Sequence, residues 1–277
     1  MIVPAASVDC HVHVFDPARF AFADDAPYRQ TIAECGTAAD LAAVLDSHGI
    51  ARAVVVTPTA GYGDDNRCML DALERLGARA RGIARVPVSV SLGVLDALAR
   101  SGVVGIRVDF IALGLAPLAD HAFDRLLGAL AERDLVLDVQ AEGDQWCAIA
   151  PALEAARVRV AIDHMGRPRP EAGLHTPGFE AMVRLAASGR AVVKLSGADR
   201  FSRTAPPYDD VLPFADAIVA AFGVDHLVWG SDWPFVRSVR RVDYGPTLDF
   251  LERIVADDER RRRILCDAAA RWFGFDE

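Results

Sequence analysis

Three histidines and one aspartate lie where short apolar segments give way to polar ones. His11 and His13 are two residues apart, so on a strand both imidazoles point to the same face. His164 ends the segment AIDH, and Asp232 follows the apolar segment LVWGS. Imidazoles and a carboxylate can bind a divalent metal ion, and they can equally activate a water molecule as general bases. Each signal alone is weak, because His-x-His pairs occur in ordinary loops, a lone histidine can sit in a core and an aspartate often caps a turn.

Eight short apolar segments, which alternate with longer helical ones, are available to position these side chains. We predict strands over residues 8–12, 51–57, 82–86, 103–108, 135–140, 158–163, 191–196 and 226–230. Their nearly continuous apolar character is typical of strands buried on both faces of a parallel sheet. The alternation predicts an α/β fold, a (β/α)8 TIM barrel that forms a single domain over residues 1–277. A doubly wound open sheet is the alternative, but no glycine-rich phosphate motif follows the first strand.

Helical segments are indicated by apolar residues at intervals of three and four. They cover residues 37–48, 66–76, 121–133 and 211–222, and Thr176-Pro177 is typical of a helix start. Glycines that could end helices follow several of the helical segments: Gly49, Gly77, Gly102, Gly189 and Gly223.

Three long loops, 14–36, 165–175 and 232–246, each follow a predicted strand. In a parallel barrel all three would therefore cover the C-terminal end of the strands. The histidines and Asp232 fall at the ends of strands one, six and eight, on the same side. Barrel enzymes place their active sites at that end, so the combined signal is much stronger than any one motif.

Composition limits the classes of partner. The chain has 277 residues, 52% of them hydrophobic, and a net charge of −9, which argues against nucleic acid or an anionic membrane as a partner. A small anionic substrate and a homo-oligomer remain compatible with this charge. Five irregularly spaced cysteines predict free thiols, and no signal peptide or bilayer-spanning segment is evident, so we expect a cytoplasmic protein.

Four motifs together resemble one family. The segments DCHVHVFDP, IDHMGRP, VKLSG and WGSDWP resemble the amidohydrolase-related family of TIM-barrel hydrolases. Within it, they resemble the lactonase branch that includes 2-pyrone-4,6-dicarboxylate lactonase and sugar lactonases. The matching segments run through nearly the whole chain in the family's order. The resemblance therefore implies a hydrolase that opens a small carboxylated lactone, such as a pyrone dicarboxylate or a sugar-acid lactone.

The resemblance also implies roles for individual residues. Asp232 would be the general base that takes a proton from the attacking water, and His11, His13 and His164 would line the water and polarise the carbonyl. Arginines would hold the substrate's carboxylates or carbonyl oxygen: Arg107, Arg167 and Arg200. This chemistry is reasonable, since ester hydrolysis needs a base and donors aimed at the oxyanion, and guanidinium groups pair well with carboxylates. Arg107 alternates with apolar neighbours in a strand, so we expect it to face a polar barrel interior.

Further substrate contacts are predicted in two loops. Tyr62 and Asn66 follow the second strand, where a simple turn is an equally good interpretation. Arg237 follows the WGSDWP motif and could bind an anion. The segment around Arg237 departs from the branch's usual residues, which suggests a different substrate.

The metal question stays open on sequence grounds. Strand four has no lysine that could bridge two metal ions, and Gln140 stands where metal-binding members usually have a histidine. His11, His13 and Asp232 could still hold a single divalent ion, zinc or manganese. We expect no cofactor to be required. The alternatives are a metal-dependent decarboxylase or amide hydrolase on the same scaffold, and a non-catalytic small-molecule binding protein.

Overall fold

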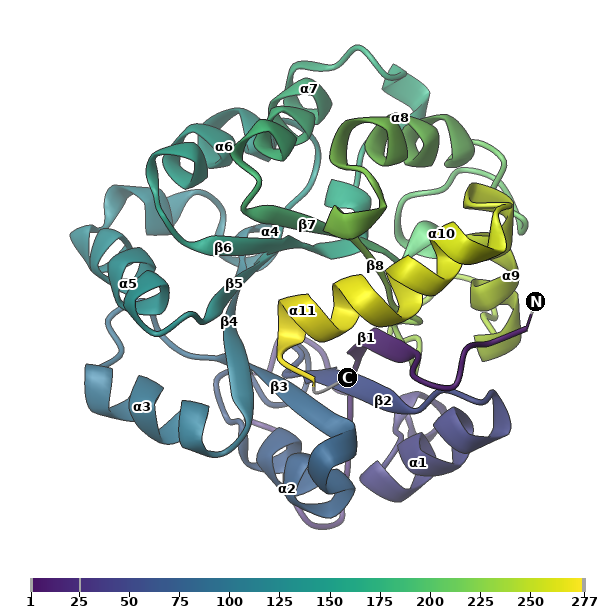
Figure 1. The fold of residues 1–277 in the computed structure, drawn as a ribbon. Helices are drawn as coiled ribbons and strands as arrows, with labels where there is room; N and C mark the ends of the chain where they lie inside the picture. The colour runs from purple at the N-terminus through teal and green to yellow at the C-terminus, as the bar shows by residue number, and fades with distance from the viewer. Residues whose placement is uncertain (1, 25, 276–277) are drawn as a thin grey trace.

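The eight predicted strands pair side by side in chain order in the computed structural model, which describes residues 2–24 and 26–275. All neighbouring strands run parallel, and helices surround them to form a (β/α)8 barrel (Figure 1). The strands are β1 (Val8–Val12), β2 (Arg52–Val56), β3 (Ala80–Arg85), β4 (Val103–Asp109), β5 (Val136–Gln140), β6 (Arg159–Ile162), β7 (Ala191–Leu195) and β8 (Leu227–Trp229). The predicted fold class and all eight predicted strands are confirmed, with small shifts at their ends.

The barrel closes between its first and last strands through the segments that carry the two histidines and Asp232. Val12 forms a parallel bridge with Trp233. The backbone N–H of Asp232 donates to the carbonyl oxygen of His11 at 2.9 Å, and the N–H of His13 donates to the carbonyl of Trp233 at 2.8 Å. Backbone pairing at the seam therefore fixes Asp232 beside the His-x-His segment.

The helices begin and end at residues that the sequence marks. They are α1 (Ala38–Ser47), α2 (Arg67–Leu76), α3 (Leu92–Arg100), α4 (Phe110–Leu113), α5 (His121–Glu132), α6 (Trp146–Ala155), α7 (Pro177–Arg184), α8 (Leu212–Phe222), α9 (Tyr244–Ile254), α10 (Asp258–Arg262) and α11 (Ala269–Phe273). The Thr176 side chain caps α7 by accepting from the N–H of Phe179. All five glycines predicted to follow helices have positive φ. No helix of the described residues is long and apolar enough to span a membrane.

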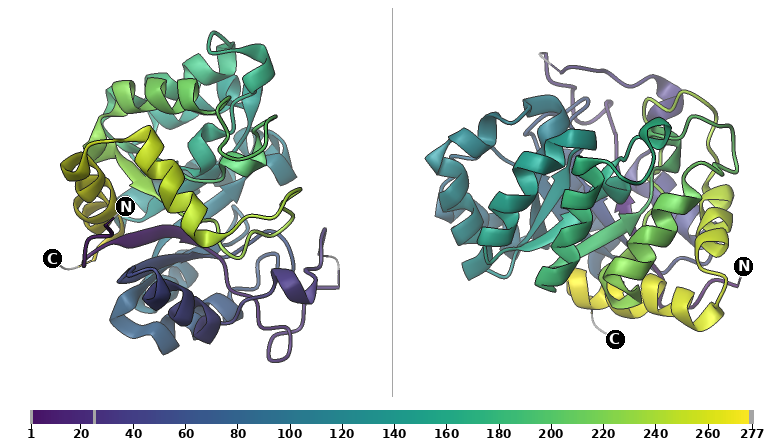
Figure 2. Two further views of the ribbon diagram at one scale, coloured as in Figure 1. Left: turned by 90° about the vertical axis from the view of Figure 1, so that its right-hand side faces the viewer. Right: turned by 90° about the horizontal axis from the view of Figure 1, so that it is seen from above.

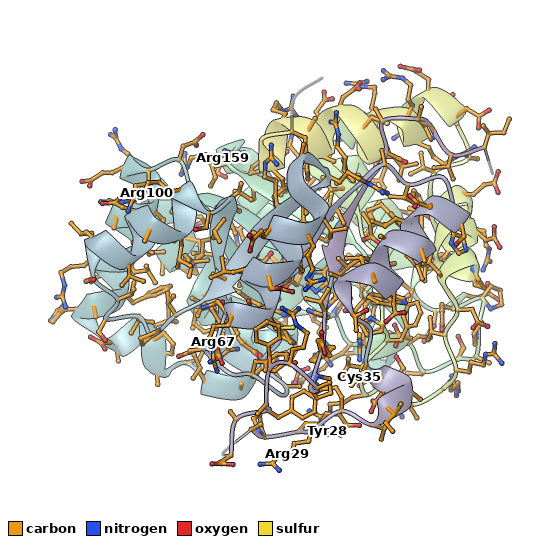
Figure 3. The ribbon with its side chains drawn as sticks, turned by 90° about the horizontal axis from the view of Figure 1, so that it is seen from below. Tyr28, Arg29, Cys35, Arg67, Arg100 and Arg159 are labelled. Carbon is orange, nitrogen blue, oxygen red and sulfur yellow. The ribbon has the colours of Figure 1, made fainter. Side chains whose placement is uncertain are left out.

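The C-terminal helices close one end of the barrel. In Figures 1 and 2, α10 and α11 lie across the N-terminal ends of the strands, and the long loops lie at the other end. Phe273 and Trp272 pack there in one apolar cluster with inward-facing residues such as Val54 and Ile83. Figure 3 shows Tyr28, in the loop after β1, at the end of the barrel opposite Arg159. A polar site must therefore open at the C-terminal end of the strands.

A buried carboxylate ties α9 to this open end. Asp9 on β1 accepts from the N–H of Ser231 at 2.9 Å and from that of His11 at 3.2 Å. Its other oxygen accepts from the Tyr244 hydroxyl at 2.7 Å. Burial raises the pKa of Asp9 to about 6, although these donors work in the opposite direction. Asp9 thus joins β1, α9 and the segment that precedes Asp232.

Replacing Tyr244 by phenylalanine should destabilise the protein more at high pH than at low pH. The pKa of Asp9 lies above its unfolded value, so its burial lowers stability as the pH rises through about 6. The Tyr244 hydroxyl stabilises the ionised form of Asp9 more than the protonated form. We therefore expect the free energy of unfolding to fall by about 1 kcal/mol at about pH 5 and by about 2–3 kcal/mol at about pH 8. Urea unfolding at both pH values measures this difference.

Tyr28→Phe is the matched control. The Tyr28 hydroxyl donates to Glu34 at 2.7 Å. Burial works to raise the pKa of Glu34, but the N–H groups of Arg237 and Thr31 and neighbouring hydroxyls hold it at about 2. Glu34 is therefore ionised at both pH values, and the control's cost should not change between them. Equal costs for Tyr244→Phe at the two pH values would contradict the assignment of Asp9.

Candidate active site

A cavity of about 610 Å³ opens at the C-terminal end of the barrel, a size typical of small-molecule sites. Tyr28 and Pro27 from the loop after β1 form part of its wall. Its lining includes the polar side chains His13, Arg107, Gln140, His164, Arg167, Arg200, Asp232 and Arg237, together with the acids Asp109, Glu142 and Asp199. The structure therefore gathers most of the predicted site residues around one space.

One carboxylate oxygen of Asp232 is paired with an arginine, and the other has no hydrogen-bond partner among the described residues. Its Oδ2 accepts a hydrogen bond from Arg200 Nε at 2.7 Å and lies 2.5 Å from Arg200 Nη2 in an ion pair. Its Oδ1 is buried without a hydrogen-bond partner, 3.3 Å from His13 Nε2 and 3.7 Å from His11 Nε2. Burial works to raise the pKa of Asp232, but the charge of Arg200 and the neighbouring imidazoles hold it well below the usual range. The carboxylate is therefore ionised, with Oδ1 available to take a proton.

The backbone at Asp232 is held in a conformation that few residues adopt. Its φ is +64°, in the left-handed region, and Phe235 and Arg237 in the same loop also have positive φ. Such conformations cost energy in non-glycine residues and are concentrated at functional sites. Gly230 lets this segment approach β1, because a Cβ there would lie 2.7 Å from the Cβ of His11.

His164 faces the other oxygen of Asp232. Its Nε2 lies 3.9 Å from Asp232 Oδ2, and its Nδ1 lies 3.0 Å from the Ser196 hydroxyl. Burial lowers the pKa of His164 to about 4, so its ring is neutral at pH 7. Gly197 is required beside it, because a Cβ at that position would lie 2.4 Å from the ring's Nδ1.

His11 on β1 and His13, which directly follows β1, lie at different depths. His13 lines the cavity, and its Nδ1 lies 2.8 Å from the carbonyl oxygen of Val56. A carbonyl can only accept, so His13 Nδ1 carries a proton and Nε2 faces Asp232. His11 is fully buried beneath Asp232 and does not line the cavity in the described structure. Burial holds the pKa of His11 well below the usual range.

Three of the four predicted arginines already have anionic partners. Arg107 faces the barrel interior as predicted, with Nη2 3.0 Å from Asp163 and a hydrogen bond to Gln140. Arg167 lies 3.5 Å from Glu142, and Arg200 pairs with Asp232.

Arg237 is the exception. It lines the rim, and its guanidinium lies 5.2 Å from the centre of the Tyr28 ring. The structure gives the Arg237 side chain no carboxylate partner among the described residues, which leaves its charge available to a ligand.

The structure does not bring Tyr62 and Asn66 to the cavity. Tyr62 is buried against Phe15, and its hydroxyl accepts from the N–H of Asp16 at 3.0 Å. The Asn66 side chain accepts from the N–H of Arg85 and donates to the Arg85 carbonyl, at 2.9 and 2.7 Å. Both side chains hold the loop after β2 by these contacts.

Two buried carboxyl groups beneath the site, those of Asp138 and Asp163, were missed in the sequence. Asp138 and Asp163 meet Lys194 inside the barrel, at 2.5 and 2.9 Å from its Nζ. All three side chains are fully buried. A usable signal existed, since each is a charge within a strand predicted to be buried on both faces. The same argument that placed Arg107 in the interior applies to them.

The donor set beneath the cavity fits a single divalent ion by its chemistry. Ligand atoms of His11, His164 and Asp232 all lie within 4.8 Å of one another. His11 Nε2 and Asp232 Oδ1 are both buried and have no hydrogen-bond partner. The sequence predicted His13 in the place that His164 takes in this set. Two imidazoles and one carboxylate are common zinc ligands.

A parallel barrel that carries an ionised aspartate and imidazoles at the C-terminal end of its strands is the arrangement of a barrel hydrolase. The chain belongs to the amidohydrolase family, whose model matches residues 8–275.

Relatives and solved structures agree with this assignment. The chain is 34% identical to a 4-sulfomuconolactone hydrolase of Rhizobium radiobacter, covering 98% of this chain and 91% of the relative. It is 32% identical to a 2-pyrone-4,6-dicarboxylate hydrolase of Comamonas testosteroni, covering 99% and 92%. A probable 2-pyrone-4,6-dicarboxylic acid hydrolase of Acinetobacter baumannii, solved with citric acid bound, superposes with a TM-score of 0.88 at 26% identity, covering 98% and 100%. The predicted family and the prediction of a hydrolase are confirmed.

Proposed function

We propose that this hydrolase opens a small lactone that carries an anionic group. The observation that supports this most directly is the ionised Asp232, whose Oδ1 is buried, unpaired and directed at neighbouring imidazoles in a cavity lined by arginines. The relatives named above act on lactones whose names include a sulfonate or carboxylate group. A strong acid group on the substrate matches Arg237, a lining cation without a carboxylate partner among the described residues.

The proposed reaction begins with water placed between Asp232 Oδ1 and the lactone carbonyl. Oδ1 takes one proton of the water while its oxygen attacks the carbonyl carbon. The neutral His164 and the cationic lining stabilise the charge that develops on the carbonyl oxygen. The ring C–O bond then breaks, and the proton held by Asp232 passes to the departing ring oxygen. The product is the ring-opened hydroxy acid.

Arg200 keeps Asp232 ready for this step. It holds Oδ2 through a hydrogen bond from Nε and an ion-pair contact from Nη2, and it also donates to the carbonyl of Val236. Its positive charge keeps Asp232 ionised, and its geometry leaves Oδ1 as the free basic atom. A residue fixed in this way loses little entropy when the transition state forms.

Asp232→Asn should abolish turnover while the protein stays folded. We expect kcat on a carboxylated lactone to fall by about 100-fold or more, because an amide cannot accept the water proton. Acid release in a weakly buffered indicator assay measures turnover, and circular dichroism checks the fold. Asp209→Asn, which changes an exposed acid paired with Arg253, is the control. Activity within about tenfold of the native protein, about 1.4 kcal/mol of barrier, would assign the base to another residue.

Arg237→Gln should weaken the binding of anionic substrates. Its guanidinium is the cavity cation without a carboxylate partner in the described structure, so we expect KM to rise about tenfold with kcat nearly unchanged. The methyl ester of the same lactone should show no such change. Arg241→Gln is the matched control, because Arg241 pairs with Asp243 at 3.0 Å and lies outside this cavity. An equal KM increase for the acid and its ester would remove Arg237 from anion recognition.

A metal-dependent reaction on the same scaffold is the second candidate. It is favoured by the unpaired His11 Nε2 and Asp232 Oδ1, which together with His164 would hold the ion. A divalent ion supplies a Lewis acid and lowers the pKa of bound water. Our leading proposal needs no metal, since cationic side chains and imidazoles already surround the reacting atoms.

Metal analysis separates the two candidates. We expect the purified protein to keep its lactonase activity after dialysis against a chelator, with less than about one-tenth of an ion per chain by elemental analysis. Stoichiometric zinc or manganese, whose removal abolishes activity and whose return restores it, would establish the second candidate instead.

A further inference from the structure

Lys194 is the only lysine in a chain with 30 lysine and arginine residues, and it is fully buried. It lies on β7 inside the barrel, beneath the cavity. Its Nζ contacts three acceptors, at 2.5 Å from Asp138 Oδ1, 2.9 Å from Asp163 Oδ1 and 3.1 Å from His11 Nδ1. The last contact joins this buried group to the His-x-His segment.

The surroundings of Lys194 keep it protonated. Burial works to lower its pKa, but the charges of Asp138 and Asp163 outweigh burial and raise it. With Arg107, which lies 3.0 Å from Asp163, the group contains two cations and two carboxyl groups, and burial raises the pKa of the Asp138 carboxyl to about 7. An ammonium has three N–H donors and no lone pair. Two of these donors form hydrogen bonds, to Asp138 Oδ1 and His11 Nδ1, whereas Asp163 Oδ1 interacts with the ammonium through its charge at 2.9 Å.

The contact with Lys194 decides where the proton on His11 sits. Because an ammonium can only donate, His11 Nδ1 must be the acceptor, and the proton of the neutral ring is then on Nε2. Asp163 Oδ1 also lies 3.1 Å from His11 Nδ1 and would favour the opposite tautomer. That approach is poorly aligned, since Asp163 Oδ1 has no hydrogen-bond partner, whereas the contact from Lys194 has hydrogen-bond geometry.

We propose that Lys194 is a positioning residue that fixes the Nε2–H tautomer of His11 and directs this proton towards Asp232 Oδ1, 3.7 Å away. His11 then supplies a donor beneath the base. The catalytic consequence rests on the proposed lactonase function, whereas the tautomer itself does not.

The choice of lysine follows from the same geometry. A guanidinium is larger and planar, so it cannot take the place of the compact ammonium that donates to both Asp138 Oδ1 and His11 Nδ1. Lys194 also occupies the cluster formed by His11 Nδ1, Asp138 and Asp163, which otherwise has the spacing of a metal site. A protonated Nε2 cannot bind a metal ion, so the proposal also removes His11 from the ligand set of the metal-dependent alternative.

The tautomer can be measured directly by NMR on the native protein with ¹⁵N-labelled histidine. The His11→Gln variant assigns the signals of His11. We expect a pyrrole-type shift for His11 Nε2 and a pyridine-type shift for His11 Nδ1. A proton on His11 Nδ1 in the native protein would overturn the proposal without any variant.

The Lys194→Met variant tests the cause. With Lys194 removed, Asp163 Oδ1 becomes the nearest partner of His11 Nδ1, so the proton should move to Nδ1 and the two shifts should exchange. Loss of the ammonium leaves two buried acids, so the double variant Lys194→Met, Asp138→Asn removes one charge of each sign and guards against unfolding. Arg261→Met, which removes a buried cation of α10, is the control and should leave the His11 signals unchanged. Unchanged His11 shifts in the folded Lys194 variants would overturn the proposal.

Kinetics then test the consequence for the reaction. We expect the Lys194 variants to lose about 100-fold in kcat with KM within about threefold, and Lys194→Arg not to restore it. Full activity with an exchanged tautomer would show that the position of the proton does not matter. If the native protein has the expected tautomer but opens no lactone, the proposed function fails while the role of Lys194 in setting the tautomer stands.

Discussion

The structure depends on one constraint: the carboxylate of Asp232 must stay ionised although it is almost completely buried. Asp232 is 1% exposed, and an isolated charge at such a depth is strongly disfavoured. Arg200 compensates the charge from one side only, through Oδ2. The imidazoles of His11 and His13 approach Oδ1 without hydrogen bonding to it. The asymmetry keeps the group ionised and leaves one oxygen able to accept a proton.

The barrel seam makes this arrangement possible. Backbone pairing between β1 and the segment after β8 places Asp232 next to His11 and His13. Asp9 reinforces the seam from below, because it accepts from the N–H groups of both His11 and Ser231. β1 and the segment after β8 therefore both close the barrel and form the floor of the site. A disturbance of the seam would move the base and its neighbours together.

Much of the fold could be predicted from the sequence, because each strand is a short apolar run followed by a turn or a polar loop. The positions of the site histidines and of Asp232 followed from the rule that barrel sites lie at strand ends. The partners of these residues could not be predicted. Arg200 was expected to bind substrate, yet its guanidinium holds Asp232, which depends on the path of the chain after β7. Tyr62 and Asn66 sit in a loop of the expected type, but packing directs them away from the cavity.

The buried charges beneath the site explain why so few cations remain for substrate. Asp138 and Asp163 contact Lys194 and Arg107, so both cations of this layer lie beside the protein's own carboxyl groups. In the cavity above, Arg200 is balanced by Asp232 and Arg167 faces Glu142. Most positive charge in the barrel therefore stabilises the protein's own carboxylates and sets their ionisation. An anionic group on the substrate would meet its strongest uncompensated attraction at the rim, while the reacting carbonyl lies deeper, beside Asp232. This separation lets the site recognise the anion without weakening the base.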